Sequence, residues 1–146
     1  MRALRQSDTV EGAAVAKLLK RGEIKINISD KILLAPQGGA MPFASNEMII
    51  YRNYAGTPKQ AAGLVAHEAE HFLQNLTPAL YANGSSALKA ELAAYGVQRR
   101  VDSSFFLRTD HEALEYILKS PLYPQVTQSV ADSLLQSGIN YTKRLR

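Results

Sequence analysis

The sequence predicts an α+β fold, in which a small sheet forms early in the chain and helices pack against it. Two observations predict the sheet: isoleucines alternate with polar residues over 23–28, and residues 47–54 are rich in β-branched and aromatic side chains. A third observation predicts the helices, because the second half of the chain repeats helix-capping patterns. With 146 residues, 46% of them hydrophobic and 21% charged, residues 1–146 are expected to form a single globular domain.

The first predicted element is a helix. Asp8 and Glu11 have the spacing of a capping box, and residues 13–19 are good helix formers. Gly22 supplies the C-terminal stop, since glycine commonly follows the last turn of a helix.

Three short runs then have the character of strands. Residues 23–28 alternate between polar and apolar side chains, and residues 32–35 are apolar. The proline and glycines of residues 36–39 form a loop. The strongest strand signal covers residues 47–54.

The second half of the chain is predicted to be helical. Thr57 and Gln60 form a capping box with Pro58 in the favoured first position, and this helix is expected to end near Leu76, before Thr77-Pro78. A second helix is predicted over residues 87–101.

Two further helices complete the predicted fold. The first opens at the capping box of residues 109–112 and closes at residues 120–121. The last spans residues 125–136, with Gly138 past its end.

The composition excludes several classes of protein. There is no cysteine, so disulfide scaffolds, thiol nucleophiles and cysteine-ligated zinc fingers are excluded, and any metal must be bound by His, Asp or Glu. The formal net charge of +4 comes partly from a basic tail, residues 139–146, which is expected to be solvated. No apolar run is long enough for a membrane span or a signal peptide, so a cytoplasmic protein without membrane partners is expected.

The chemistry is concentrated in the segment His67-Glu-Ala-Glu-His71, which has the H-E-x-x-H pattern. Residues four apart share one face of a helix, so the His67 and His71 imidazoles can reach the same metal ion. Glu68 lies beside that face and is well placed to accept a proton from a metal-bound water. The alternative is an ordinary pair of surface histidines, but the helix has an apolar stripe on the opposite side. This stripe comprises Val65, Ala69, Phe72, Leu73 and Leu76.

A third metal ligand is expected from the next helix, and Glu91 is the candidate. Its helical neighbours Ala87, Leu88, Ala94 and Tyr95 are mostly apolar. A carboxylate in the middle of an apolar face must find a cation or lose its charge, and zinc is the obvious cation. The alternative is a buried pair between Glu91 and an arginine or lysine.

The remaining candidates have two interpretations each. Tyr95 can donate a hydrogen bond to a developing oxyanion, or simply pack, and Gln98 is similarly ambiguous. Asp102 can orient a histidine or lie in solvent at a helix end. His111 is a further ligand or oxyanion donor, or an ordinary polar residue beside a helix cap.

Together these residues resemble the gluzincin metallopeptidases, the thermolysin-like branch of the zincins, in which H-E-x-x-H on one helix is followed by a glutamate on the next. Glu91 follows His71 by 20 residues and matches in type and spacing. The resemblance implies that His67, His71 and Glu91 bind Zn²⁺ and that Glu68 is the general base. It also implies a zincin-like α+β fold, with a small N-terminal sheet, an active-site helix, a ligand-glutamate helix and two further helices.

The resemblance further implies that residues 47–54 form an edge strand, along which a peptide substrate binds as an antiparallel strand. The chain has no room for the large C-terminal subdomain of thermolysin-like enzymes. It is also similar to the ImmA/IrrE-type domains, small cytoplasmic zincins tied to bacterial regulation. The metzincin extension is absent, because residues 72–81 contain neither glycine nor histidine.

The expected function is therefore a zinc-dependent metallopeptidase that hydrolyses peptide bonds with a metal-activated water. The expected partner is a peptide or protein substrate. The first alternative is a non-catalytic zinc-binding domain of zincin fold with a regulatory or binding role. The second alternative is a metal-free helical protein whose basic tail binds nucleic acid, a partner the sequence otherwise does not favour.

Overall fold

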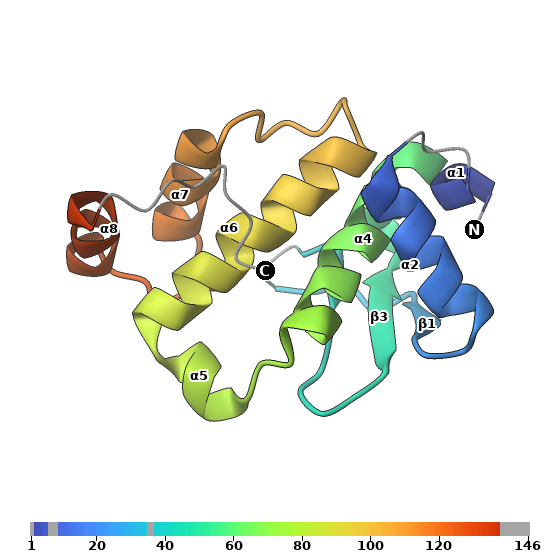
Figure 1. Ribbon diagram of the computed structural model, residues 1–146, viewed down its shortest axis with the longest axis horizontal. Helices are drawn as coiled ribbons and strands as arrows, with labels where there is room; N and C mark the ends of the chain where they lie inside the picture. The colour runs from blue at the N-terminus through green and yellow to red at the C-terminus, as the bar shows by residue number, and fades with distance from the viewer. Residues whose placement is uncertain (1, 6–8, 35–36, 138–146) are drawn as a thin grey trace.

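A computed structural model describes residues 2–5, 9–34 and 37–137, and this part of the chain contains eight helices and a three-stranded sheet (Figure 1). The predicted α+β class is therefore confirmed. In order, the elements are α1 (Arg2–Arg5), α2 (Val10–Lys20), β1 (Lys25–Ser29), β2 (Gly39–Ala40), β3 (Glu47–Tyr51), α3 (Arg52–Ala55), α4 (Pro58–Gln74), α5 (Pro78–Ala82), α6 (Gly84–Val101), α7 (Asp110–Lys119) and α8 (Gln128–Gln136).

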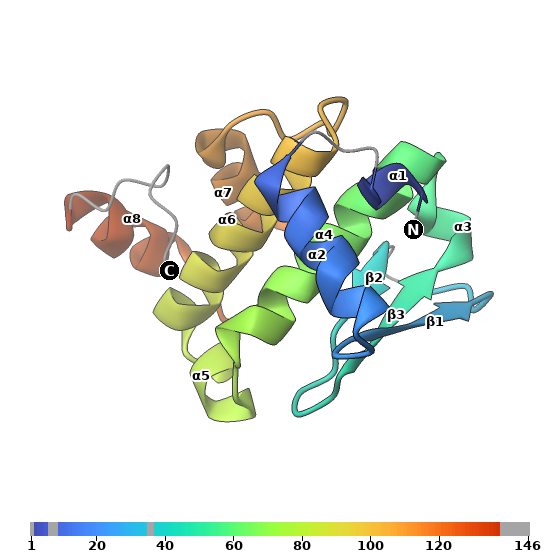
Figure 2. The same cartoon turned by 45° about the vertical axis from the view of Figure 1, so that its right-hand side comes forward.

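Helices α4 and α6 form the centre of the structure and run in opposite directions (Figures 1 and 2). The sheet and α2 lie on the side of α4, whereas α7 and α8 lie on the side of α6. Each side has its own buried hydrophobic cluster. The α4-side cluster includes Val15, Ile24, Met48, Ile50, Val65 and Ala69. The α6-side cluster includes Leu88, Leu92, Leu114, Ile117, Tyr123 and Leu134.

The helix starts follow local side-chain chemistry. The Thr57 hydroxyl accepts a hydrogen bond from the Gln60 backbone N–H, and the Gln60 side chain accepts one from Thr57 N–H, which confirms this capping box. The capping box at Thr109 is confirmed in the same way. Helix α2 instead begins at Thr9, whose hydroxyl accepts from the Gly12 N–H. Asp8, the predicted cap, lies outside the described residues.

The sheet has the strand order β1-β3-β2, which places β3 in the centre. Strand β1 pairs with β3 in parallel, and β2 pairs with β3 antiparallel through Gly39 opposite Ile50 and Ala40 opposite Ile49. The prediction that residues 47–54 form an edge strand is therefore wrong. Its β-branched and aromatic side chains reflect burial in the middle of the sheet rather than an edge position.

The edge strand beside α4 is β2, which begins at the last residue of the loop predicted over residues 36–39. It has no β-forming side chains because it lies directly on α4. A Cβ atom on Gly38 would overlap the Leu64 side chain, and one on Gly39 would lie 3.0 Å from Glu68 Cγ and Oε1. Glycine allows this close approach of the backbone to α4. Because glycine has a low strand propensity, the same residues give no strand signal in the sequence.

Other predicted boundaries are also corrected. Residues 32–34 form no strand, and residue 35 lies outside the described range. The β3 strand ends at Tyr51 and continues into α3. The chain after α4 forms a further helix, α5, because Thr77 caps it and Pro78 occupies its first turn.

At the C-terminal end, α8 begins at Gln128 rather than at residue 125. Gly138 and the basic tail, residues 139–146, lie outside the described residues. No helix in the described ranges is long and apolar enough to cross a membrane.

Candidate metal centre

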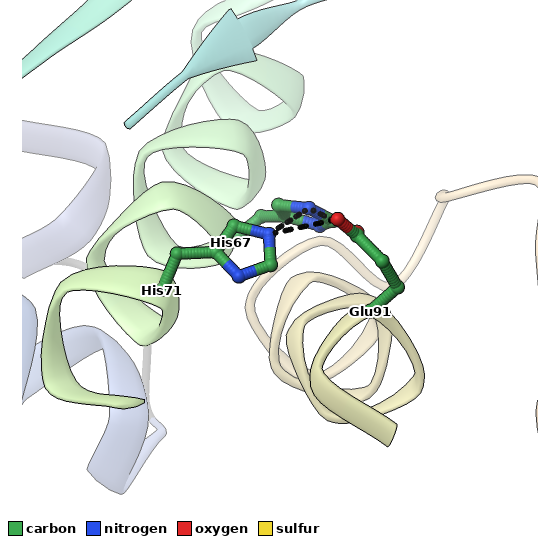
Figure 3. Close-up of side chains that lie close together, drawn as sticks. All are labelled: His67, His71 and Glu91. Atoms are coloured by element: carbon green, nitrogen blue, oxygen red, sulfur yellow. Dashed lines mark hydrogen bonds and ion pairs between the residues drawn. The ribbon is translucent and has the colours of Figure 1, made fainter. Parts of the chain in front are cut away.

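The structure brings His67, His71 and Glu91 together between α4 and α6 (Figure 3). The two Nε2 atoms of the histidines lie 3.2 Å apart. Glu91 Oε2 lies 3.3 Å from His67 Nε2, and Glu91 Oε1 lies 3.4 Å from His71 Nε2. All three side chains are at least largely buried, with exposures of 7%, 12% and 3%. Three potential metal-ligating groups thus converge from two helices.

These separations fit a tetrahedral metal site. Ligand atoms about 2.0–2.1 Å from a central zinc ion are about 3.3–3.4 Å from each other. The Glu91 Oε2 atom supports the same interpretation, because it is buried and forms no hydrogen bond within the described part of the chain. It lies at ion-pair distance from His67 Nε2 without the directional geometry of a hydrogen bond, as expected of an oxygen that would coordinate a cation. The donor set, two imidazoles and a carboxylate, suits zinc among several divalent metals.

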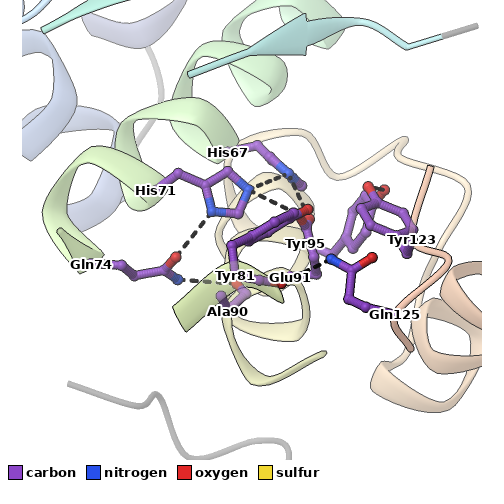
Figure 4. Close-up of polar contacts among 9 residues, drawn as sticks. All are labelled: His67, His71, Gln74, Tyr81, Ala90, Glu91, Tyr95, Tyr123 and Gln125. Atoms are coloured by element: carbon purple, nitrogen blue, oxygen red, sulfur yellow. Dashed lines mark hydrogen bonds and ion pairs between the residues drawn. The ribbon is translucent and has the colours of Figure 1, made fainter. Parts of the chain in front are cut away.

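Neighbouring side chains orient two of these groups (Figure 4). His71 Nδ1 lies 3.0 Å from Gln74 Oε1, and Gln74 Nε2 donates to the Ala90 carbonyl oxygen at 3.0 Å. A proton on Nδ1 that is held by Gln74 leaves Nε2 as the metal-binding nitrogen. The Tyr81 hydroxyl donates to Glu91 Oε1 at 2.6 Å, which holds the carboxylate toward the histidines.

The electrostatics of the metal-free cluster are those of a buried ion pair. Burial alone would lower the pKa of His71, but the Glu91 carboxylate outweighs this effect and raises the pKa to about 10. Burial also opposes ionisation of Glu91, yet the nearby His71 and His67 hold its pKa below the usual range. A divalent cation would therefore replace a proton that already compensates the Glu91 charge.

Glu68 lies next to the cluster, where β2 crosses α4, and is 5% exposed. Burial raises the pKa of its carboxyl above the usual value, while the two histidines oppose this shift and Glu91 adds to it. A backbone hydrogen bond from Met41 helps to hold the carboxylate. Glu68 can therefore hold or release a proton beside the histidines.

The cluster opens into a first cavity of about 590 Å³. It is lined by the hairpin of residues 41–46 between β2 and β3, and by Tyr81 and Tyr123. A space of this size falls in the range of ligand and substrate sites, about 300–1,000 Å³.

The other predicted residues lie at different distances from the cluster, and one of them contacts it. Tyr95 packs edge-to-face on His67 with ring centroids 4.6 Å apart, and its hydroxyl lies 2.9 Å from the Tyr123 hydroxyl. Burial, followed by the charge of Glu91, raises the pKa of both phenols, so both stay protonated. His111 is exposed on α7 and lies 3.4 Å from Glu115, outside the cluster.

Asp102 and Gln98 are buried on α6, toward its C-terminal end. Asp102 Oδ1 accepts hydrogen bonds from Ser104 N–H and Oγ–H, and no histidine bonds to it among the described residues. Of the predicted apolar stripe on α4, Val65 and Ala69 are buried, but Leu73 is 56% exposed, so the stripe is shorter than predicted.

Sequence reasoning missed two residues of the centre, Gln74 and Tyr81. Gln74 could have been found, because it follows His71 by three residues and therefore lies over the same helix face. Tyr81 gave no comparable signal, since it reaches Glu91 only through α5, an element that was not predicted.

No family model matches the chain, and neither the curated proteins nor the solved structures include a match. The fold and the geometry of the His67, His71 and Glu91 cluster are therefore the basis of any functional proposal.

Proposed function

We propose that the protein is a zincin-like, zinc-dependent metallopeptidase of the gluzincin type. The observation that carries the proposal is the convergence of His67, His71 and Glu91 at mutual distances of 3.2–3.4 Å, with Glu68 beside them. A structural zinc site is usually closed by four protein ligands, whereas three ligands beside a cavity leave room for water. The described residues offer three ligands and a cavity.

His67 Nε2, His71 Nε2 and the Glu91 carboxylate would hold the zinc ion, which when bound activates water and polarises the scissile carbonyl. Glu68 accepts a proton from the attacking water and delivers it to the amine that leaves when the C–N bond breaks. The raised pKa of Glu68 suits both halves of this transfer. Tyr95 and Tyr123 stay protonated, and whichever hydroxyl accepts their mutual hydrogen bond keeps its own proton to donate.

The substrate would lie along β2 rather than along residues 47–54. Among the described residues, no strand pairs with the outer edge of β2, and Gly39 lies directly over Glu68. An extended peptide that adds to this edge would place its backbone next to the cluster.

The proposal is tested by the Glu68→Gln variant of the zinc-loaded protein. We expect kcat/KM for peptide cleavage to fall by about 10²- to 10⁴-fold, because a general base has been removed. Zinc content, measured by atomic absorption, should stay at the wild-type level. Glu70→Gln is the matched control, since Glu70 lies in the same motif but lines neither cavity.

Two outcomes would contradict the proposal. Protein that stays zinc-free after equilibration with zinc would exclude the metal centre. Protein that binds zinc stoichiometrically but cleaves no peptide would instead identify a non-catalytic zinc-binding domain with a regulatory or binding role.

A further inference from the structure

A second cavity, of about 360 Å³, adjoins the metal centre toward the start of α4. His67 and Glu68 line both cavities, so the second cavity is directly connected to the proposed reaction site. It lies between α3, the first turns of α4 and the loop after α6. Its volume is in the range of small-ligand sites, about 300–1,000 Å³.

The second cavity has a polar wall made by α6. Gln98 and Asp102 line it and are 4% and 1% exposed. Gln98 Oε1 and Asp102 Oδ2 are buried and have no hydrogen-bond partner within the described ranges. A buried acceptor without a donor costs stability, and a buried carboxylate costs more. Two residues that line the second cavity therefore carry buried acceptor atoms without donors, and a ligand that brings donors would satisfy them once the two side chains turn toward it.

The protein's own cations do not neutralise Asp102. Four cationic side chains lie nearby, on α6, at the facing start of α4 and in the following loop, and each has another partner. These partners are Asp110 for Arg99, Glu11 for Arg100, and Ser103 for both Lys59 and Arg108. Within the described ranges none of these four forms an ion pair with Asp102, so a cationic ligand would meet a carboxyl group that no cationic side chain has paired.

Aromatic rings form another wall of the same cavity. Phe106 and Tyr116 have ring centroids 5.6 Å apart, and Phe105 stacks on Tyr95 at 5.9 Å. Aromatic faces attract guanidinium and ammonium groups, and they also pack against the methylene stems that carry these groups. A carboxylate combined with aromatic rings selects a long cationic side chain.

The course of β2 fixes which part of a peptide would enter this cavity. The chain runs from Gly38, which lines the second cavity, through β2 to residues 41–46, which line the first cavity. Antiparallel pairing is the more common arrangement of adjacent strands. A peptide that pairs antiparallel with β2 therefore runs from the first cavity to the second, and its C-terminal part enters the second.

We propose that the second cavity binds the side chain of a lysine or arginine, and that in a substrate this is the residue immediately after the scissile bond. This inference rests on the proposed peptidase function and adds its specificity. Asp102 and Gln98 accept hydrogen bonds from the cationic group.

The first experiment measures specificity with the zinc-loaded protein. Cleavage of a diverse peptide library, followed by mass spectrometry, should give products that begin with lysine or arginine. In a matched peptide pair, lysine after the scissile bond should be preferred over norleucine by about 10- to 100-fold in kcat/KM. Asp102→Asn should reduce this ratio to below about threefold. Glu115→Gln, which removes an exposed charge on α7, should leave the ratio unchanged. Cleavage without this preference, or a preference that survives Asp102→Asn, overturns the inference.

A second experiment separates the inference from the peptidase function. Calorimetry with argininamide, in the Glu68→Gln protein loaded with zinc, should show saturable binding. Citrullinamide, which has the same shape without the charge, should bind at least about tenfold more weakly. Absence of argininamide binding overturns the inference even if peptides are cleaved. Binding that depends on Asp102, in a protein that cleaves no peptide, supports the cation site and contradicts only the peptidase proposal.

Discussion

The two ends of the α4–α6 pair each bury a carboxylate, Glu91 at one end and Asp102 at the other, but in opposite surroundings. Glu91 has two histidines and the Tyr81 hydroxyl within 3.4 Å. The Asp102 side chain accepts hydrogen bonds from Ser104 alone among the described residues, and its second oxygen has no partner there. The first end brings together three groups that could hold a metal, whereas the second leaves a buried carboxyl oxygen without a partner among the described residues. The two buried acids are therefore the basis of two different proposals.

The largest difference between the two ends should appear in zinc affinity. Glu91→Ala removes a proposed ligand and should weaken zinc binding by more than about 100-fold, because the loss of an outer hydrogen-bond partner alone costs about 10- to 100-fold. Asp102→Ala should change zinc affinity by less than about threefold. Competition with a chromophoric chelator measures both affinities. Equal losses in the two variants would show that the ends are not independent.

The second effect concerns protons at the Glu91 end. Zinc requires the neutral imidazole of His71, whose pKa in the metal-free protein is about 10, so binding must displace a proton at any pH below that value. Zinc affinity should therefore rise with pH, by about tenfold per pH unit between pH 6 and pH 9.

Calorimetry at pH 8 in two buffers of different ionisation enthalpy checks this sign directly. We expect the release of about one proton per zinc ion. A histidine with the ordinary pKa of about 6.5 is already neutral at pH 8 and would release almost none. The His71→Ala variant provides the baseline.

A smaller effect separates two tyrosines that lie close to the same carboxylate. Tyr81→Phe removes the hydrogen bond to Glu91 Oε1 and should weaken zinc binding by about 10- to 100-fold. Tyr95→Phe removes the hydrogen bond to Tyr123 and should leave zinc affinity unchanged. The same chelator competition measures both variants. A fall in kcat/KM of Tyr95→Phe at constant zinc affinity would assign that tyrosine a role in the reaction.

The smallest effect is expected from the packing of α4 against α6 near Asp102. A Cβ atom on Gly63 would lie 2.9 Å from Asp102 Cβ, so Gly63→Ala should destabilise the protein by about 1–2 kcal/mol. Gly96→Ala is the matched control within α6, because its Cβ would meet only arginine side-chain atoms at 3.5 Å or more. This control should stabilise the protein by about 0.4–1 kcal/mol. Urea unfolding measures both changes, and destabilisation by Gly96→Ala would show that the close approach at Gly63 is not the cause.

The His67, His71 and Glu91 cluster could be predicted from the sequence, because each of these residues is recognised from its neighbours along the chain. His67 and His71 share a helix face by spacing alone, and Glu91 is conspicuous as a carboxylate on an apolar face. The convergence of the three side chains depends on two long helices whose periodic patterns are easy to recognise. Their predicted roles as zinc ligands remain a prediction.

The rest depends on contacts between distant segments, which no local pattern reveals. Strand β2 consists of a glycine and an alanine, which have low strand propensity, so the edge of the sheet was assigned wrongly. Asp102 could be recognised as polar at a helix end. The sequence could not show that Asp102 Oδ2 has no partner, because this depends on Arg99 and Arg100 forming ion pairs with Asp110 and Glu11 instead.

The close contact between β2 and α4 has a consequence for related sequences. Two consecutive glycines allow the sheet edge to rest on the helix that carries Glu68. A methyl group would overlap the Leu64 side chain at Gly38 and press against the Glu68 side chain at Gly39. Homologous chains are therefore expected to retain small residues here even where the hairpin that follows varies in length and composition. A search for distant homologues would gain sensitivity by combining this glycine pair with the two histidines and the distal glutamate.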